Sequence, residues 1–275
     1  MQPEISELTF AYLWSWLPYT SCHLSHWEEA IILQVKSAST GVSYILPPMT
    51  PDYERAAGVI WYLLEHDSAP ARFARVPQKM VDSLPDEPDL SVEPQRERFD
   101  YLHRADELRD LPGTRYHPKR NQIRQFEQQC PDAEYQVLTP ELATQCITFT
   151  DKWLENHPKK DLDGLQREVK TTIRMLGNLE WLPLEGGALV ENGRILAFAL
   201  GEPINDATIA ERVEKADTSV SGSYQAINRA FARQTAADFE WINREQDLGL
   251  PGLRRAKQSY YPERLVEKYE VAVEE

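Results

Sequence analysis

GGALVENGRILAFALGEP (residues 186–203) consists of two β-rich runs on either side of the pair Asn192-Gly193. An Asn-Gly pair readily adopts the positive backbone angles of a type I′ turn, which closes a two-residue β-hairpin. We therefore expect two antiparallel strands here. A third β-rich run, ATIAERVEKA (207–216), follows after a short connection and extends the predicted sheet.

Segments on both sides of this hairpin give the second half of the chain a definite order of elements. Thr139 and Pro140 predict a helix start, because threonine is a favoured N-cap and proline is tolerated in the first turn. Ile227, Ala230 and Phe231 lie on one face of a predicted helix and are expected in the core. The expected elements are strand 134–139, helices 140–157 and 162–179, the three strands above, helix 222–238, strand 239–245, helix 250–261 and strand 264–273.

The first half of the chain predicts a similar alternation of strands and helices. Thr50 and Pro51 indicate a helix start in the same way as Thr139 and Pro140. The expected elements are an aromatic helix or turn over 6–17, strands 30–37 and 41–48, helix 50–66, strand 72–77, helix 79–84, a Pro-rich acidic loop over 85–97, strand 98–105 and helix 117–129.

The order of elements decides the expected fold. The second half reads β-α-α-β-β-β-α-β-α-β, which is the order of the acyl-CoA N-acyltransferase (GNAT) topology, and the first half matches the later part of the same unit. We therefore predict an α/β (α+β) fold of tandem GNAT-like, mixed-sheet domains. We expect an N-terminal GNAT-like domain over residues 1–132 and a C-terminal GNAT-like domain over 133–275 that carries the functional site.

Composition and charge exclude several classes of protein. The chain has 275 residues and a formal net charge of −14, which argues against non-specific nucleic-acid binding. Its three cysteines are widely spaced without a CxxC pair, and Cys22 with His23 and His26 supplies at most three ligands, so no metal site is expected. The start MQPEISELTF lacks the features of a signal peptide, and no stretch is apolar enough to span a membrane. We expect a cytoplasmic protein without an integral membrane segment.

Four segments together carry a resemblance to a known family. They are FAYLWSW, RYHPKRNQI, RVEKAD with GSYQAINRAFA, and FEWINREQDLGLPGLRRAKQSYYPERLVEKY. They resemble the C-terminal catalytic domain of phosphatidylglycerol lysyltransferase, over nearly the whole chain and most densely from 207 to 269. More distantly, a Tyr-Gln pair opening a helix, then Asp-Leu-Gly, then a Lys-x-x-aromatic step resembles the Fem aminoacyltransferases. Both resemblances imply a tandem GNAT fold and transfer of an aminoacyl group from aminoacyl-tRNA to an amine or hydroxyl acceptor.

The chain departs from these relatives and from ordinary GNAT enzymes in two respects. It shows no transmembrane region of its own, so a lipid acceptor is not implied. It also lacks the Arg/Gln-x-x-Gly-x-Gly/Ala loop that holds the coenzyme A pyrophosphate, and only SVSGSY stands in its place. Gly222 and the helix N-terminus behind it could still hold an anion.

The segment YHPKRNQI forms a local cationic island in an acidic protein. It carries Lys119, Arg120 and neighbouring basic residues at the first turn of a helix, where the free N–H groups and the helix dipole also attract anions. We interpret Lys119, Arg120 and Asn121 as binding the tRNA acceptor end or another phosphorylated donor. The alternative is a solvated helix face that pairs with surface acids.

The segments ERVEKAD and GSYQAIN place further polar groups at the expected cleft. Alternation along the strand sends Glu214 and Lys215 to opposite faces, so only one can face the cleft, and Glu214 is our candidate to orient or deprotonate the attacking group. The alternative is an ordinary ion pair at a strand end. In the next helix, Tyr224, Gln225 and Asn228 are expected to meet substrate, or else to be plain polar residues of an amphipathic helix.

The segment NREQDLGLPGLRRAKQSYY (243–261) supplies the remaining candidates. Asn243, Glu245 and Asp247 alternate along an extended segment and are expected on one side, facing Lys257 across a glycine turn. The carboxylates would hold a substrate ammonium group and Lys257 would stabilise the oxyanion or leaving group, a role that the Fem resemblance gives to the lysine of its matching step. The alternative is structural: Asp247 caps the following helix and Arg254 ties it down. Arg254 and Tyr260 complete the candidate substrate-binding residues.

Three functions are compatible with these motifs. The first is an aminoacyl- or acyltransferase that works by direct attack, with Glu214, Asp247 and Lys257 as catalytic residues and Lys119 and Arg120 anchoring the donor. The second is a coenzyme A-dependent N-acetyltransferase acting on a small amine. The third is a non-catalytic module that binds an amino acid, a peptide or an anionic metabolite. No tightly bound cofactor is expected; aminoacyl-tRNA or acyl-CoA would be a co-substrate, and the acceptor a small molecule or peptide.

Overall fold

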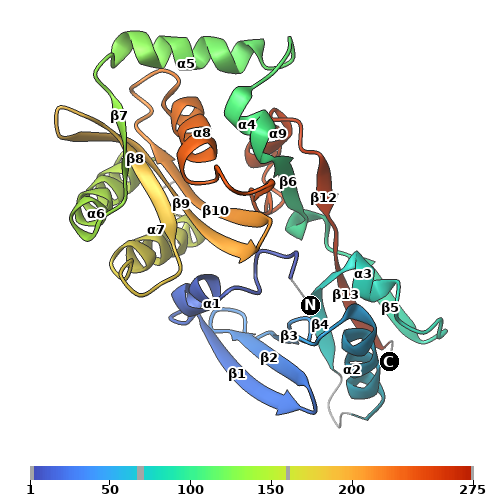
Figure 1. Ribbon diagram of the computed structural model, residues 1–275. Helices are drawn as coiled ribbons and strands as arrows, with labels where there is room; N and C mark the ends of the chain where they lie inside the picture. Colours follow the sequence, from blue (N-terminus) through green and yellow to red (C-terminus); the bar gives the residue numbers. More distant parts are fainter. Residues whose placement is uncertain (1–2, 67–70, 159–161, 274–275) are drawn as a thin grey trace.

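The structure is a computed structural model that describes residues 3–66, 71–158 and 162–273. Within these residues the strands form two mixed β-sheets, one toward the lower right and one toward the upper left of Figure 1. The first sheet and its helices comprise β1 (Thr20–Trp27), β2 (Ala30–Ser37), β3 (Ser43–Ile45), α2 (Tyr53–His66), β4 (Arg72–Pro77), α3 (Gln78–Val81), β5 (Leu90–Pro94) and β13 (Lys268–Val273). Helix α1 (Phe10–Trp16) precedes β1 and buries Ala11 in the core of the second sheet. The 3-10 turn η1 (Arg96–Arg98) leads to the second sheet, which with its helices comprises β6 (Asp100–Arg104), α4 (Ala105–Asp110), α5 (His117–Gln129), β7 (Glu134–Val137), α6 (Pro140–Glu155), α7 (Asp163–Leu176), β8 (Glu185–Glu191), β9 (Arg194–Asn205), β10 (Thr208–Ala216), α8 (Ser223–Gln234), β11 (Trp241–Asn243), α9 (Pro251–Gln258) and β12 (Arg264–Val266). The predicted mixed α/β class is confirmed.

The second sheet has the predicted order of elements. Strands β7 to β10 form an antiparallel run, and β11 lies parallel to β10 after a crossover through α8, as in a GNAT-like unit. Asn192 and Gly193 have φ values of 50° and 77° and form the turn of the β8–β9 hairpin, as predicted. Thr139 caps α6, because its side chain accepts a hydrogen bond from the Leu142 N–H at 3.2 Å.

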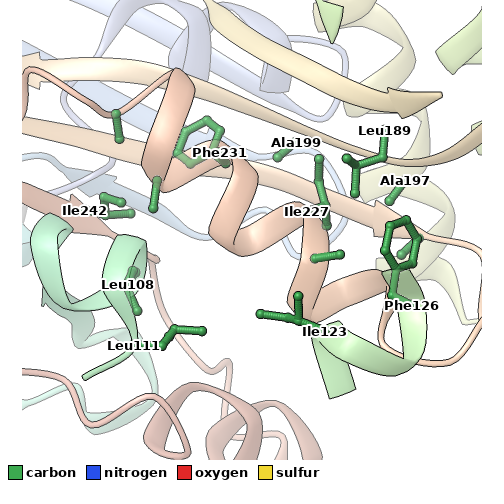
Figure 2. Packing of buried hydrophobic residues seen from close by; sticks show 14 of the residues in the cluster. Leu108, Leu111, Ile123, Phe126, Leu189, Ala197, Ala199, Ile227, Phe231 and Ile242 are labelled. Atoms are coloured by element: carbon green, nitrogen blue, oxygen red, sulfur yellow. The ribbon is translucent and has the colours of Figure 1, made fainter. Parts of the chain in front are cut away.

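The central parallel strands of the second sheet separate after a short contact. Only Thr208 to Ala210 of β10 are paired with β11, although β10 continues to Ala216. Helix α8 covers this part of the sheet through Ile227 and Phe231, which are both fully buried, as Figure 2 shows. Helix α8 therefore covers the gap that forms where β10 and β11 separate, and side chains from both strands can enter this gap.

The two sheets exchange strands. Strand β6 lies between β11 and β12 in the second sheet, and β13 lies between β4 and β5 in the first, within the described chain. The single strand expected over 264–273 is therefore two strands, β12 and β13, which belong to different sheets. The division of strands between the sheets does not coincide with a single boundary near residue 132, because the chain crosses between β5 and β6 and returns between β12 and β13.

Besides the 3-10 turn η1, three elements were not predicted, and the start of α2 was misplaced. Strand β1 is largely exposed and polar, and β5 lies inside the Pro-rich acidic segment; each is an edge strand, which needs no apolar alternation on both faces. Helix α4 is short and follows β6 directly. Helix α2 begins at Tyr53 rather than at Pro51, because the Asp52 carboxylate accepts the Arg55 N–H at 2.8 Å.

A buried ionic cluster joins the two sheets. Lys268 Nζ on β13 donates to Glu7 Oε2 and to Asp100 Oδ1, both at 2.6 Å, and Arg75 Nε lies 3.1 Å from Glu7 Oε1. The Lys268, Glu7 and Asp100 side chains are completely buried. We call these four residues the closed cluster, because two carboxylates meet two cations. It fixes the N-terminal segment between the sheets.

Candidate active site

An arginine side chain fills the gap between β10 and β11. Arg244 follows the last residue of β11, and its guanidinium binds two carboxylates of β10. Nε lies 2.5 Å from Glu211 Oε2, and Nη2 lies 2.6 Å from Glu214 Oε2. The Glu214 side chain is 15% exposed and that of Glu211 3%, so the group is buried yet reachable from solvent.

A β-bulge brings the two glutamates to the same face. Residues three apart on a regular strand point to opposite faces, but the register of β10 with β9 shifts between Glu211 and Val213. Arg212 is the extra residue, and its guanidinium binds Glu202 and Glu245 instead. Lys215 lies on the opposite face from Glu214, as predicted, and binds Glu168 at 2.7 Å. The bulge therefore creates the carboxylate pair.

Helix α8 contributes one amide to the same group. Asn228 Nδ2 donates to Glu214 Oε2 at 3.2 Å and to Glu211 Oε1 at 3.4 Å. Its Oδ1 is buried and has no hydrogen-bond partner within the described part of the chain. The predicted position of Asn228 at the site is thus found, with one acceptor left unused.

Two half-buried lysines lie beside the cluster. Lys119 Nζ on α5 donates to Ser259 Oγ at 2.7 Å and lies 4.0 Å from the centre of the Tyr260 ring. Lys257 on α9 donates to the backbone carbonyl of Arg244. Burial, and then the Arg244 charge, lowers the pKa of each lysine to about 8. Both can therefore gain or lose a proton near neutral pH.

The pKa of Glu214 is shifted in the opposite direction. Burial raises it to about 8 and the neighbouring Glu211 raises it further, whereas Arg244 opposes the shift. A carboxyl group with such a pKa can accept a proton from an attacking group near neutral pH. The arrangement joins a tuned base, a fixed guanidinium and two lysines, which suits proton removal and the stabilisation of developing negative charge.

His103 and Tyr260 complete the surroundings of Arg244. Tyr260 is buried, and the Arg244 guanidinium lies 5.0 Å from its ring centre. His103 on β6 is 1% exposed, and its pKa lies well below the usual value because of burial first and then the charges of Arg244 and Lys257. Its ring lies near the Tyr260 backbone, but neither ring nitrogen makes a hydrogen bond of good geometry to a described residue. His103 is therefore a neutral side chain beside the cluster.

The expected convergence of Asn243, Glu245 and Asp247 on Lys257 is not found. Asn243 Nδ2 donates to Asp100 at 3.0 Å, and Glu245 Oε1 lies 2.5 Å from Arg212. Strand β11 ends at Asn243, and Glu245 has a left-handed φ of 56°, so the alternation assumed from the sequence stops there. The three side chains thus belong to three separate contacts.

Asp247 holds the turn before α9. Its carboxylate accepts hydrogen bonds from the Tyr101 hydroxyl at 2.7 Å, from Arg254 Nε at 2.8 Å and from the Gly249 N–H at 2.8 Å. Arg96 also lies 3.2 Å away. These donors, those of Arg254 first, hold the pKa of Asp247 below its ordinary value although burial opposes the shift. The structural alternative is found in part: Arg254 ties Asp247 to α9, but the N-cap of α9 is Leu250, whose side chain cannot form a capping hydrogen bond.

The cationic island is only partly directed at the site. Arg120 donates to the backbone carbonyls of Leu111 and Gly113 and so fixes the loop between α4 and α5. Asn121 contacts His117 at 3.3 Å and accepts from Arg124 at 3.1 Å on the outer face of α5. Lys119 is the member of this segment that lies beside Arg244 and Tyr260.

The start of α8 is closely packed. Gly222 has a φ of 78°, and a Cβ there would lie 1.9 Å from the Gln122 carbonyl oxygen of α5. Tyr224 is half-buried, and its hydroxyl accepts from Trp153 Nε1 at 3.3 Å; burial raises its pKa to about 12. Gln225 is half-buried at the same helix start. Gly222 therefore serves a close backbone contact.

Sequence reasoning missed three residues of this site: Glu211, Arg244 and His103. Glu211 and Glu214 are three residues apart on a strand, so their side chains share a face only if a bulge lies between them. The sequence gives no signal for this bulge. Arg244 lies between Asn243 and Glu245, so the alternation assumed for those two residues would place it on the opposite face. A usable signal was an arginine directly after the apolar β11, since a buried guanidinium needs carboxylate partners.

The fold and this cluster define a class: two-sheet α/β proteins of GNAT-like build with a charged centre where the parallel strands part. The chain belongs to the family described as phosphatidylglycerol lysyltransferase, C-terminal, whose model matches residues 1–272. The resemblance inferred from the sequence is thus confirmed. Within the described ranges, no helix is both long and apolar enough to cross a bilayer.

Solved structures give one strong similarity and several weak ones. A conserved protein of unknown function from Bacteroides thetaiotaomicron VPI-5482 is 30% identical with a TM-score of 0.89, over 100% of this chain and 94% of that one. A functionally unknown conserved protein from Staphylococcus epidermidis ATCC 12228 is 11% identical with a TM-score of 0.44, over 93% and 95%. A tandem GNAT protein from the clavulanic acid biosynthesis pathway is 9% identical with a TM-score of 0.46, over 95% and 87%. The last two similarities are too weak to carry an argument, and the search of curated proteins gave no match.

Proposed function

We propose that this protein is an acyltransferase that moves an aminoacyl group from aminoacyl-tRNA to an amine or hydroxyl acceptor. The observation that carries the proposal is the pair Glu211 and Glu214 bound to one Arg244 where β10 and β11 part. Membership of the lysyltransferase-domain family supports an aminoacyl donor. Glu214 and Lys257 remain our candidate catalytic residues, and Glu211 and Arg244 join them.

The side chains suit direct attack in a single complex. Glu214 takes a proton from the acceptor, whose lone pair attacks the ester carbonyl carbon of the donor. The ester C–O bond then breaks, and the ribose oxygen leaves and takes up a proton. Lys257 and Lys119 stabilise the negative charge that develops on oxygen during these steps. Aminoacyl transfer needs no covalent intermediate on the protein, because positioning supplies much of the acceleration.

The start of α8 favours a donor other than coenzyme A. In GNAT enzymes this loop would have to present free N–H groups to the pyrophosphate. Here the Ser219 N–H donates to Asp217 and the Ser221 N–H to Gln129, both at 2.9 Å. The Ser223 N–H donates to the Val220 carbonyl at 3.4 Å. We therefore place aminoacyl-tRNA first and acyl-CoA second as co-substrate.

The donor would reach the site along α5. Lys119 would contact the terminal phosphates or ribose, while Arg124 adds positive charge on the exposed face of the helix. Arg120 would act by holding the loop that positions this helix. In a protein of net charge −14, such contact is local, and binding should weaken steeply with added salt.

A charged-tRNA assay tests the proposal. Bulk tRNA carrying labelled amino acids is incubated with the protein and a small-molecule extract as acceptor pool. We expect acceptor-dependent loss of label from tRNA and a new labelled small product. If label is lost from tRNA no faster than without protein, and the protein acetylates members of an amine panel from acetyl-CoA, then the donor is acyl-CoA rather than aminoacyl-tRNA. Turnover from neither donor would contradict the enzyme proposal.

A further inference from the structure

The candidate active site contains a buried hydrogen-bond acceptor that lacks a donor. Asn228 is 2% exposed, and its Oδ1 has no partner among the described residues. Its orientation follows from chemistry: Glu214 Oε2 already accepts from Arg244, so the amide must present Nδ2 to it. A buried polar atom without a partner costs about 1–3 kcal/mol. The site is therefore complementary to a group that carries an N–H or O–H.

The two carboxylates of this site outnumber the cations that touch them directly among the residues that the structure describes. Glu211 and Glu214 are in direct contact with one cation, Arg244. Lys119 donates to Ser259 and Lys257 to a backbone carbonyl, and neither forms an ion pair with the two glutamates in the described chain. Burial first, and then the Glu211 charge, raises the pKa of Glu214 to about 8 against the opposing charge of Arg244, so a second cation in contact would favour the ionised form of Glu214.

We propose that Glu211, Glu214 and Asn228 form a binding site for a primary ammonium group, so that the acceptor of the reaction is a primary amine. An ammonium group would place a second cation in direct contact with the two glutamates, and its three N–H groups can reach both a Glu214 oxygen and Asn228 Oδ1. A hydroxyl has one hydrogen to donate and no charge. A quaternary ammonium has the charge but no donor. The identity of the group as acceptor rests on the proposed function, whereas the binding site does not.

The proton balance of the transfer agrees with this assignment. The bound ammonium gives one proton to Glu214 and becomes a neutral amine with a free lone pair. The lone pair forms the N–C bond, the ester C–O bond breaks, and a second N–H proton passes to the leaving ribose oxygen. The products are an amide and a free hydroxyl, and Glu214 returns its proton to water. A hydroxyl acceptor has a single hydrogen, which cannot be donated to Glu214 and to Asn228 Oδ1 at the same time.

Three matched probes test the site directly. Saturation-transfer NMR on the whole protein at pH 8 compares glycinamide, glycolamide and betaine amide, which present an ammonium, a hydroxyl and a quaternary ammonium. At this pH about half of the Glu214 carboxyl groups are ionised and about half of the glycinamide is protonated. We expect glycinamide to bind at least tenfold more tightly than either of the others. Sodium and potassium salts serve as further competitors, since an alkali cation has the charge without the donors.

Variants separate a specific site from general charge attraction. Glu214→Gln keeps the shape of the side chain and removes its ionisable group. Asn228→Ser replaces the amide by a shorter hydroxyl group. Each change should weaken the binding of glycinamide at least tenfold. Glu168→Gln is the matched control, because Glu168 binds Lys215 on the opposite face of β10 and should leave binding unchanged. Circular dichroism verifies that each variant is folded. Should Asn228→Ser fail to fold, Glu214→Gln with the three probes still decides.

Defined outcomes would overturn the inference. Equal binding of glycolamide or betaine amide, equal competition by potassium, or unchanged glycinamide binding in folded Glu214→Gln would each contradict it. Transfer from charged tRNA to glycolamide without amine preference would contradict the amine acceptor while the transferase proposal stands. Selective glycinamide binding without transfer to any acceptor would contradict the transferase proposal while the ammonium site stands.

Discussion

Each sheet has a pair of parallel strands near its centre, with an arginine bound to carboxylates beside that pair. The two arginine sites differ in how their charges are completed. In the first sheet β3 and β4 are parallel, and Arg75 near the end of β4 binds Glu7 and the Tyr44 hydroxyl. In the second sheet β10 and β11 are parallel, and Arg244 just after β11 binds Glu211 and Glu214. Each sheet thus places an arginine against carboxylates beside its parallel pair.

The difference lies in what completes the charges. In the closed cluster the N-terminal segment supplies Glu7, and Lys268 from the exchanged strand β13 supplies a second cation. In the second sheet, the described chain brings no second cation into contact with Glu211 and Glu214. Buried charges that are fully paired stabilise the fold, whereas buried charges that are incompletely paired are candidates for binding a ligand. We therefore expect the function to lie in the second sheet, and the closed cluster to stabilise the contact between the sheets.

Breaking the closed cluster should give the largest effect. Lys268→Met leaves the buried carboxylates of Glu7 and Asp100 without their common cation. Removing one partner of a buried ion pair costs about 3–5 kcal/mol, so we expect that loss in the free energy of unfolding measured with urea. Lys257→Met is the matched control: Lys257 is half-buried and bonds to one carbonyl, and a loss below about 1 kcal/mol is expected. Equal losses in the two variants would contradict the distinction between the clusters.

Changing the open cluster, by which we mean Glu211, Glu214 and Arg244, should affect activity and spare stability. Glu214→Gln preserves the shape of the side chain but removes the base, so we expect the transfer rate to fall by about 10²–10³-fold, as for other general bases. The unfolding midpoint should change little, since Arg244 retains Glu211. The rate of transfer from charged tRNA and a urea titration measure the two effects. A rate within threefold of wild type would remove Glu214 from the mechanism.

The sequence predicted the scaffold of the second sheet better than its chemistry. Asn192-Gly193 and Thr139 specify their turn and cap locally, so the element order around them could be derived. The exchange of β6 and β13 depends on contacts across the molecule and leaves no local signal. Within the site, Glu214 and Asn228 were predicted as site residues and lie together, whereas Glu211 joins them only through a bulge.

The same limit explains the error over residues 243–257. Alternation along an extended chain was assumed to continue past Asn243, but Glu245 and Leu248 have left-handed backbone angles of 56° and 53°. Such angles are uncommon for residues other than glycine and are imposed by the surrounding contacts, here the binding of Glu245 to Arg212. Without alternation, Asp247 turns toward Arg254 rather than toward Lys257.

The open cluster should give the reaction a pH optimum near 8. Burial raises the pKa of Glu214 to about 8, so the base is protonated and inactive below that pH. Burial lowers the pKa of Lys257 to about 8, so its stabilising charge is lost above it. Each limb should approach a tenfold change per pH unit in the transfer rate. The charged and polar groups acting on Glu214 are Arg244, Glu211 and Asn228, and those acting on Lys257 are Arg244, Glu245, Glu211 and Asp100.

Variants assign the two limbs of this profile. Glu214→Gln should abolish the rise on the acid side, and Lys257→Met should abolish the fall on the alkaline side. Stability follows a different course: a carboxyl group with a raised pKa favours the folded state at low pH and loses that contribution as pH rises through about 8. Unfolding measured at each pH therefore separates loss of fold from loss of rate. An acid limb that persists in Glu214→Gln would assign it to another group.

The smallest effect is expected at Lys119, which separates the site from the rest of the cationic island. Lys119→Ala removes a cation beside Tyr260, and we expect charged tRNA to bind about tenfold more weakly, with a salt slope reduced by about one. Arg124→Ala removes a charge from the outer face of α5, where Arg124 contacts Asn121. The loss of binding free energy in this variant should be less than half of the loss in Lys119→Ala. Fluorescence anisotropy of a labelled charged minihelix at several salt concentrations measures both. Equal weakening of tRNA binding in the two variants would indicate a diffuse attraction along α5. It would contradict the proposed contact between Lys119 and the tRNA donor.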